Sequence, residues 1–123
     1  MKLHLANTRN GYTLTGYGTG FLAVNGTRYE HALVVTPDTA PEPWSVDSVN
    51  MLTADAAGLL LAGSPEIIII GTGPTQIFPE PARLRPLIEA RIGVEIMNTP
   101  AACRTYNVLM GEGRRVLAAI CLP

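Results

Sequence analysis

The chain has 123 residues, of which 47% are hydrophobic and 15% are charged, and its formal net charge is −1. This composition excludes a disordered chain and fits one folded domain, residues 1–123. The balanced charge gives no footprint for nucleic acid, and no apolar run approaches the roughly 18 residues that cross a membrane. We expect no nucleic-acid partner and no membrane span. The absence of a signal-peptide pattern predicts a cytoplasmic location.

The N-terminal portion predicts a hairpin. Residues 1–11 are polar and are expected to form a partly ordered lead-in. Gly16–Gly20 resembles a phosphate-binding loop in composition, but it precedes a strand and not a helix, so we interpret it as a bend or bulge. Asn25-Gly26 joins Phe21–Val24 to a second strand that begins at Thr27 and is expected to continue to Val35. Asn-Gly favours the two-residue type I′ turn.

Prolines make residues 36–45 an expected irregular surface connection, in which Trp44 is expected to cover the rim of the core. A helix is predicted to follow, with Thr53 as its N-cap. Gly63 and Pro65 are expected to end this helix. The residues expected to form its apolar face are Ala56, Leu59 and Leu60.

The run Ile67–Ile70 is the strongest strand signal in the chain. Side chains branched at Cβ favour extended backbone, and neighbours along a strand point to opposite faces. An unbroken isoleucine run therefore predicts a central strand covered on both sides. Gly71-Thr72-Gly73 follows at the carboxyl end of this strand, which is the edge where open α/β sheets bind ligands.

Two further helices and two further strands are predicted after this point. A helix over residues 81–92 is expected to stop at Gly93, and a strand over residues 94–97 precedes a third helix that Thr99 would cap and that contains Pro100 near its start. A last strand is expected over residues 116–122. The apolar stripe of the 81–92 helix is expected to contain Leu84, Leu87 and Ile88 and to end at Arg91. The residues expected to share one apolar face of the third helix are Ala102, Tyr106, Leu109 and Met110.

The order of these elements predicts an α/β fold. The C-terminal half reads strand–helix–strand–helix–strand, with crossovers long enough for parallel pairing. The N-terminal hairpin adds antiparallel strands. The product is a central mixed sheet with helices packed on it and a hairpin beside it.

Gly71, Thr72 and Gly73 are the first candidates for ligand binding. They do not match the dinucleotide fingerprint, which needs a third glycine that opens a helix, or the P-loop, which needs Gly-Lys-Ser/Thr. A tight turn is the favoured interpretation. The alternative is a turn whose backbone N–H groups bind a small anion.

Thr99, Cys103 and Arg104 are the second group of candidates, at the same sheet edge if the strands are parallel. A cysteine in the first turn of a helix beside an arginine is a candidate for a lowered thiol pKa. A nucleophile also needs a base, and only His4 and His31 are present, neither placed near Cys103 by the sequence. A packed, inert thiol is therefore favoured.

No catalytic residue, metal ligand or cofactor is predicted. The two cysteines and two histidines lack the short spacing of a metal site, and Cys121, within an apolar strand, is expected to be buried. Three acidic residues lie at predicted element boundaries, and ion pairs with arginines explain them better than acid–base catalysis. The acidic residues are Glu66, Glu95 and Glu112, and the arginines are Arg104, Arg114 and Arg115.

Three linked motifs, Glu66–Gly73, Val94–Leu109 and Glu112–Val116, resemble the domain-of-unknown-function 498 family, also described as Mth938-like. The resemblance covers nearly the whole chain and is strongest from residue 66 onward. It implies a three-layer fold with a central mixed sheet between helices and a hairpin layer. It implies no established enzymatic activity, whereas the mitochondrial relatives of the family act as complex I assembly factors through protein contacts.

Two functional hypotheses follow. The leading one is a non-catalytic binding or assembly module that contacts a protein partner, through the proline-rich loop 74–81 and the adjacent arginine-bearing helix. The alternative is a small-molecule or anion-binding enzyme that uses Gly71–Gly73 together with Thr99–Arg104. A monomer or a weak homo-oligomer is expected.

Overall fold

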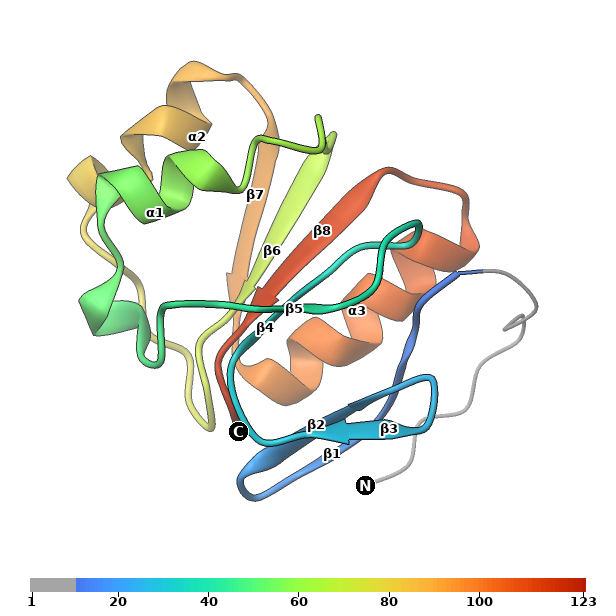
Figure 1. Ribbon diagram of the computed structural model, residues 1–123. Helices are drawn as coiled ribbons and strands as arrows, with labels where there is room; N and C mark the ends of the chain where they lie inside the picture. Colours follow the sequence, from blue (N-terminus) through green and yellow to red (C-terminus); the bar gives the residue numbers. More distant parts are fainter. Residues whose placement is uncertain (1–10) are drawn as a thin grey trace.

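The computed structural model describes residues 11–123, and the lead-in expected over residues 1–11 lies outside the described residues except for Gly11. Two sheets and three α-helices make up the described part (Figure 1). The smaller sheet, in the order β1-β2-β3, contains β1 (Leu14–Gly18), β2 (Phe21–Val24) and β3 (Thr27–Tyr29). The larger sheet, in the order β5-β4-β8-β6-β7, contains β4 (Leu33–Val35), β5 (Glu42–Pro43), β6 (Ile67–Gly71), β7 (Gly93–Met97) and β8 (Val116–Ile120). The helices are α1 (Ala54–Leu59), α2 (Arg85–Glu89) and α3 (Thr99–Gly111), with 3₁₀ turns η1 (Val49–Met51) and η2 (Pro81–Leu84).

Strand β6 occupies the interior of the larger sheet and confirms the predicted central strand. It pairs in parallel with β7 on one side and with β8 on the other, whereas β4 pairs antiparallel with β8. The sheet is therefore mixed, as predicted. Ile68 and Ile70 pack into the apolar cluster that includes α1 and α2, and Ile69 packs into the cluster around α3. All three side chains are fully buried, so both faces of β6 are covered.

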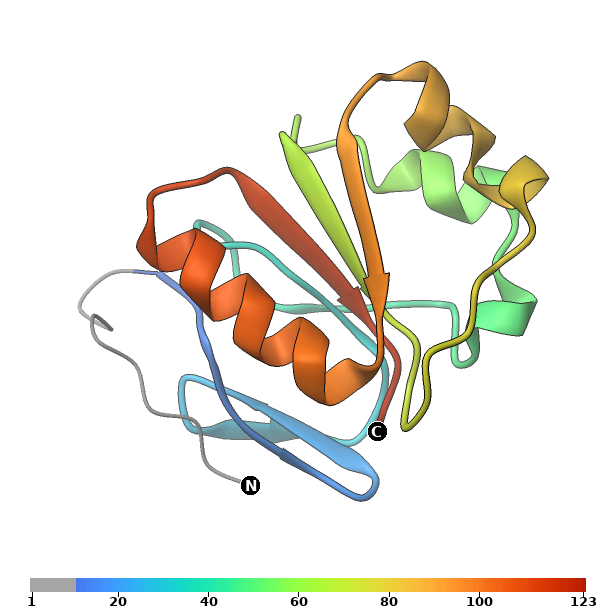
Figure 2. The same cartoon turned by 180° about the vertical axis from the view of Figure 1, so that it is seen from behind.

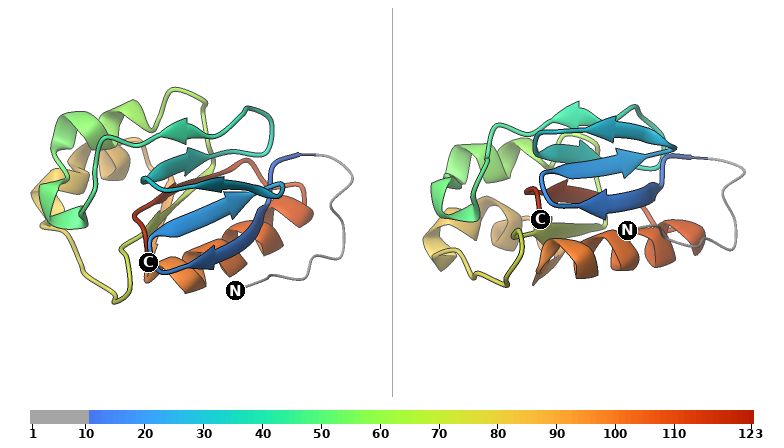
Figure 3. Two further views of the ribbon diagram at one scale, coloured as in Figure 1. Left: turned by 60° about the horizontal axis from the view of Figure 1, so that its bottom comes forward. Right: turned by 90° about the horizontal axis from the view of Figure 1, so that it is seen from below.

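The larger sheet lies between two covering layers (Figures 1 and 2). One layer consists of η1, α1, η2 and α2. The other consists of α3 together with the three-stranded sheet, which Figure 3 shows beside α3 at the bottom of the molecule. This arrangement confirms the three-layer α/β fold that the family resemblance implied.

The predicted hairpin turn is confirmed, but the length of its second strand is wrong. Asn25 and Gly26 have φ angles of 48° and 83°, as a type I′ turn requires. Strand β3 ends at Tyr29, and the chain bends at residues 30–31 before β4 joins the other sheet. The bend arises because Tyr29 packs against the α3 cluster, whereas Ala32 is buried in the cluster on the opposite face of the larger sheet.

The connection over residues 36–45 is more regular than predicted. Glu42 and Pro43 form the short strand β5, which pairs antiparallel with β4. Trp44 donates its backbone N–H to Ala32 O at 2.9 Å, and its side chain is buried in the cluster beneath α1, as expected.

Helices α1 and α2 are shorter than predicted, and two predicted core residues are exposed. Leu59 is 75% exposed and Ile88 is 57% exposed. Because α1 has six residues and α2 has five, each buries only a short part of its apolar stripe: Ala57 and the C-cap Leu60 at α1, and Leu87 in α2. Arg91 has a φ of 59°, so it takes the left-handed conformation just beyond the helix that a glycine was expected to supply.

Gly93 was predicted to end the second helix, but it is the first residue of β7. The last strand of the sheet, β8, ends at Ile120 and not at residue 122.

Asn107 of α3 joins the two halves of the protein. Its buried side-chain amide accepts a hydrogen bond from Leu14 N at 2.9 Å and donates one to Leu14 O at 2.8 Å. The amide thus pairs with the outer edge of β1 as a neighbouring strand would. The β1–β2 register shifts between Leu14 and Gly16, before the segment expected to bend or bulge; within that segment Gly16–Gly18 belongs to β1, and the chain turns at residues 19–20 to enter β2.

We predict that Asn107→Ala lowers the free energy of unfolding by about 3 kcal/mol, because Leu14 N–H and C=O would both lose their partner in a buried position. Urea denaturation monitored by circular dichroism measures this change. Val108→Ala, at the exposed neighbouring position, is the matched control and should change stability by less than about 0.5 kcal/mol. Equal stabilities of the two variants would contradict the structural role of Asn107.

Candidate functional site

The structure brings the two groups of predicted site residues together. Gly71–Gly73 continues from the carboxyl end of β6, and Thr99 begins α3 directly after β7. Gly73 N donates to Thr99 Oγ1 at 2.9 Å, and Thr99 N donates to Gly73 O at 2.8 Å. The expectation that both groups share one sheet edge is therefore confirmed.

Thr99 was predicted to be the N-cap of α3, but Asn98 is the N-cap. Asn98 accepts a hydrogen bond from Ala101 N at 2.9 Å through its side chain. The Thr99 hydroxyl, which is fully buried, donates to Cys121 O at 2.6 Å while it accepts from Gly73 N. One hydroxyl thus connects the ends of β6 and β8 to the start of α3. The strand–helix junction offered two adjacent capping residues, and the sequence did not distinguish them.

The first backbone N–H groups of α3 all have partners within the chain. Thr99 N–H donates to Gly73 O, Pro100 has no N–H, and Ala101 N–H donates to the Asn98 side chain. Ala102 N–H donates to Asn98 O at 2.9 Å. A helix N-terminus binds anions through N–H groups that lack such partners, so an anion here would have to displace existing bonds.

Thr72 closes the turn after β6. Its N–H donates to Met97 O at 2.9 Å, and its hydroxyl donates to Thr75 O at 2.6 Å and accepts from Ile77 N at 3.1 Å. Gly73 has a φ of 98°, a conformation that favours glycine. These bonds form a closed turn, and ligand binding at Gly71–Gly73 stays a prediction.

Gly71 allows α3 to lie close against the sheet. A Cβ atom at this position would lie 3.0 Å from Ile120 Cγ2 and 3.1 Å from both Ala102 Cβ and Thr99 Oγ1. The requirement for glycine at this position is therefore explained by packing of α3 on β6.

Cys103 and Arg104 differ in environment although they are adjacent. The Cys103 thiol is fully buried in the cluster between α3 and the sheets, and burial raises its pKa from 9.0 to about 12; the nearby Arg104 charge opposes this only in part. The prediction of a lowered pKa is therefore wrong, and the interpretation of a packed thiol is confirmed; that the thiol is inert stays a prediction. Arg104 is exposed, and its Nη1 donates to Tyr17 Oη at 3.3 Å.

Glu66 lies at the opposite, amino end of β6. Its Oε1 accepts a hydrogen bond from Arg115 N at 2.9 Å, and its Oε2 lies 3.3 Å from Arg114 Nε. The backbone hydrogen bond from Arg115, with the charges of both arginines, holds the pKa of this carboxyl below its ordinary value. The predicted ion pair is confirmed for Glu66, and it ties the loop after α3 to β6.

A cleft of about 800 Å³ lies at that amino end, away from the predicted site. Its walls come from the loop between β4 and β5, the residues after α1 and the loop before β8, and they include Thr36, Trp44, Leu60, Pro65, Arg115 and Leu117. None of the six predicted site residues lines this cleft. The prolines and Trp44 of residues 36–45 were the only sequence signal for it.

Within residues 11–123, no group of three or more His, Cys, Asp or Glu side chains is placed to hold a metal ion. Every buried side-chain nitrogen or oxygen in the same part of the chain has a hydrogen-bond partner. His4 lies outside the described residues.

A family model described as "Protein of unknown function (DUF498/DUF598)" matches residues 14–121. The chain belongs to this family. It is 32% identical over 105 residues to a "13 kDa major membrane protein" of Francisella tularensis, with 85% of each chain covered. It is also 32% identical over 112 residues to the bovine "NADH dehydrogenase [ubiquinone] 1 alpha subcomplex assembly factor 3". That match covers 89% of this chain but 60% of the bovine protein, so the chain spans less than two thirds of that relative's length.

Solved structures agree with the fold. A crystal structure of a Bordetella parapertussis protein, a structural genomics target, has a TM-score of 0.88 and 37% identity, with 95% of this chain and 100% of that chain covered. A solution structure from Bordetella pertussis, described as a Mth938-like domain, has a TM-score of 0.79 and 37% identity, with 98% and 92% covered. A Bartonella henselae structure described as an outer membrane protein, at 24% identity and a TM-score of 0.79, covers 92% of this chain and 96% of its own and shows the fold alone. In residues 11–123 we find no helix with the length and apolar character needed to cross a membrane.

We predict that Thr99→Val lowers the free energy of unfolding by about 3 kcal/mol, because Gly73 N–H and Cys121 C=O would both lose their buried partner. Thr99→Ser is the matched control; it keeps the hydroxyl and should cost about 1 kcal/mol for the lost methyl group. Denaturant titration of both variants measures the difference. Similar losses for valine and serine would show that the hydroxyl bonds contribute little.

We predict that Cys103 and Cys121 do not react with a thiol-labelling disulfide in the folded protein at pH 8, since both are buried and their pKa values are raised to about 12 and about 11. Labelling should occur only after unfolding in urea. The unfolded thiol of Cys103 ionises near pH 9.0 while the folded one keeps its proton to about pH 12, so stability should fall as the pH rises through this range. Rapid labelling of native Cys103 would restore the nucleophile hypothesis.

Proposed function

We propose that this chain is a non-catalytic module that acts through contacts with a protein partner, and that the partner is a subunit of a respiratory NADH dehydrogenase under assembly. The identity of the partner rests on the relatives described as assembly factor 3, which are about as similar to this chain as the bacterial relative is. A cytoplasmic location is part of the same proposal.

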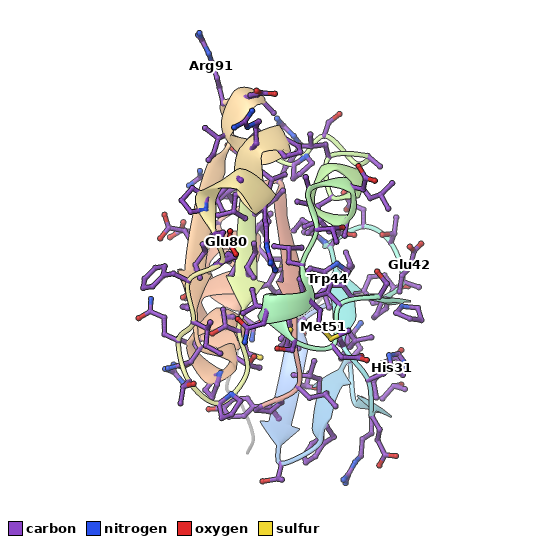
Figure 4. All side chains as sticks on the ribbon, turned by 90° about the vertical axis from the view of Figure 1, so that its left-hand side faces the viewer. His31, Glu42, Trp44, Met51, Glu80 and Arg91 are labelled. Atoms are coloured by element: carbon purple, nitrogen blue, oxygen red, sulfur yellow. The ribbon has the colours of Figure 1, made fainter. Side chains whose placement is uncertain are left out.

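The observation that carries the proposal is the placement of exposed apolar side chains. Of the five large hydrophobic residues that are strongly exposed in the described part of the chain, three belong to η1, α1 and α2 of one covering layer, and a fourth lies in loop 74–80, which leads into η2 of that layer. These four are Met51, Leu59, Phe78 and Ile88. Figure 4, which looks onto this side of the molecule, shows Met51 below Trp44. Exposed apolar side chains gathered on one side of a protein are typical of a contact surface.

Loop 74–80 is held in a defined position, which favours a preformed contact surface. Gln76 Nε2 donates to Ile96 O at 2.9 Å, and Ile77 N donates to Thr72 Oγ1 at 3.1 Å. Arg83 of η2 also donates through Nη1 to Asn50 O and Leu52 O, which fixes η2 beside η1. Phe78, 70% exposed, therefore projects from a fixed loop, and an ordered aromatic side chain binds with little loss of conformational entropy.

We predict that the affinity-tagged chain, expressed at its native level, co-purifies with NADH dehydrogenase subunits, and that Phe78→Asp reduces their recovery at least tenfold because a carboxylate would be buried in an apolar contact. Val108→Asp is the matched control: Val108 is 59% exposed on α3, in the other covering layer, and its substitution should leave recovery unchanged. Quantitative mass spectrometry of the captured proteins measures both.

Absence of these subunits from the wild-type capture, under gentle extraction, would refute the assembly proposal. Equal recovery by the two variants would refute the surface on the α1–α2 layer while leaving the partner intact. Circular dichroism of both variants checks that each is folded.

The alternative proposal is anion or small-molecule binding at Gly71–Gly73 and Thr99–Arg104, supported by the meeting of both groups at one sheet edge. A heteronuclear NMR titration with inorganic phosphate and a nucleotide panel tests it. Shifts confined to the amides of Gly73 and Ala101 would support this alternative. Unchanged spectra would remove it.

A further inference from the structure

Strand β7 is an outer strand of the larger sheet, with β6 as its single neighbour in the sheet order. Figure 2 shows it in front of the sheet, with no further strand outside it. Its five residues include exposed Gly93 and Glu95 and half-buried Val94 and Ile96. An outer strand of this length presents a row of backbone groups to which another chain can pair.

The hydrogen bonds to β6 determine which backbone groups face outward. Gly93 N donates to Glu66 O at 3.2 Å, and Met97 O accepts from Thr72 N at 2.9 Å, so the groups of Gly93 and Met97 face inward. Successive residues of a strand direct these groups to alternate sides, so the N–H and C=O groups of Val94 and Ile96 face outward. Gln76 Nε2 already donates to Ile96 O, in the place where the N–H of a neighbouring strand would donate.

The other outer strands are shorter or already occupied. The Asn107 side chain bonds to the outward groups of Leu14 on β1. β5 has two residues and includes Pro43, which lacks an N–H, and β3 has three residues and is followed by Glu30, which pairs with Arg28 at 3.9 Å. Short strands, proline and charged residues are the usual means of preventing edge pairing. Among residues 11–123, β7 is an outer strand of five residues without proline, and its edge carries the exposed Glu95 and the Gln76 bond to Ile96 O, which a partner strand would replace.

Glu95 determines which kind of chain fits this edge. It is exposed at the centre of β7, and among the described residues no ion pair engages it. A two-fold antiparallel pairing of two copies centred on Glu95 would match Val94 with Ile96 of the other copy and place the two Glu95 carboxylates opposite each other. Like charges in this arrangement are destabilising, whereas a lysine or arginine opposite Glu95 is favourable.

We propose that the outer edge of β7 binds an extended segment of a partner protein, which adds a sixth strand to the five-stranded sheet and places a Lys or Arg opposite Glu95. Apolar residues on either side of that cation would pack beside Val94 and Ile96. This inference rests on the proposed function, since it specifies how the partner is bound, and it uses a surface separate from Phe78.

The first test is an NMR titration of the full labelled chain with two synthetic peptides, Thr-Val-Thr-Val-Lys-Val-Thr-Val-Thr and the same sequence with a central Glu. The Lys peptide should shift the amide signals of Val94 and Ile96 and slow their hydrogen exchange. It should bind about fivefold more tightly than the Glu peptide, which places like charges together. Glu95→Lys, at an exposed position, should reverse this preference.

The second test is Val94→Pro, which removes one outward N–H and leaves the inward bonds of β7 in place. It should abolish the peptide-induced shifts, while Ala40→Pro, in the exposed loop between β4 and β5 at the opposite edge of the sheet, serves as the control and should keep them. Because Glu95→Lys tests the same edge without a backbone change, misfolding of the proline variant would not affect the conclusion.

Three results would overturn the inference: no shift of Val94 and Ile96 with millimolar Lys peptide, equal affinity for both peptides, or the same shifts on concentrating the protein alone, which would make a second copy the occupant. The capture experiment separates this inference from the proposed function. NADH dehydrogenase subunits captured equally by wild type and Glu95→Lys, with no peptide binding, would refute the β7 site only. Peptide binding without captured subunits would refute the proposed partner only.

Discussion

The burial of β6 on both faces is the constraint on which the rest of the structure depends. Its isoleucines alternate between two apolar clusters, so each face of the sheet needs its own covering layer. The chain supplies α1 and α2 for one face and α3 with the three-stranded sheet for the other. Because parallel pairing of β6 with β7 and β8 requires crossovers, the helices that cover the sheet are also its connections. The order of the strands therefore also determines which helices cover each face of the sheet.

At the carboxyl end of β6, where α/β folds commonly bind ligands, the backbone groups are instead bonded by side chains of the same chain. Open α/β sheets bind ligands where strands end because backbone groups there lack partners. In this chain the Thr99 hydroxyl, the Asn98 side chain and Thr72 provide those partners. The polar residues that drew attention in the sequence thus stabilise the junction of strand, turn and helix.

Local signals predicted much of the fold. The β6 run and the Asn25-Gly26 turn are decided by the preferences of adjacent residues, so the sequence sufficed. The separation of β3 from β4 depends on which cluster buries Tyr29 and which buries Ala32, and no local pattern contains that information. The exposed Leu59 and Ile88 lie at helical spacing after Ala56 and Leu84, but α1 and α2 are too short to bury a whole stripe.

At the candidate site the sequence predicted the shared edge but not the hydrogen bonds within it. Thr99 and Asn98 are both capping residue types, and their roles are assigned by the bonds of Thr99 to Gly73 and Cys121 and by the bond of Asn98 to Ala101. Arg104 and the helix N-terminus indicated a reactive Cys103, yet burial outweighs both, and burial follows from the whole fold. The hydrogen bonds of Asn107 could not be predicted from the local sequence because its partner, Leu14, is 93 positions away.

That separation between Asn107 and Leu14 has a consequence for biosynthesis. The N-terminal part of a chain leaves the ribosome first, and β1–β3 form a three-stranded sheet through short-range turns. The surface on which this sheet packs includes α3, which follows the other described helices in the chain. The apolar residues of the β1–β2–β3 sheet, among them Leu14 and Leu22, therefore remain uncovered until α3 has been synthesised. A nascent chain paused before residue 99 would expose this surface, and transiently exposed apolar surface of this kind binds chaperones.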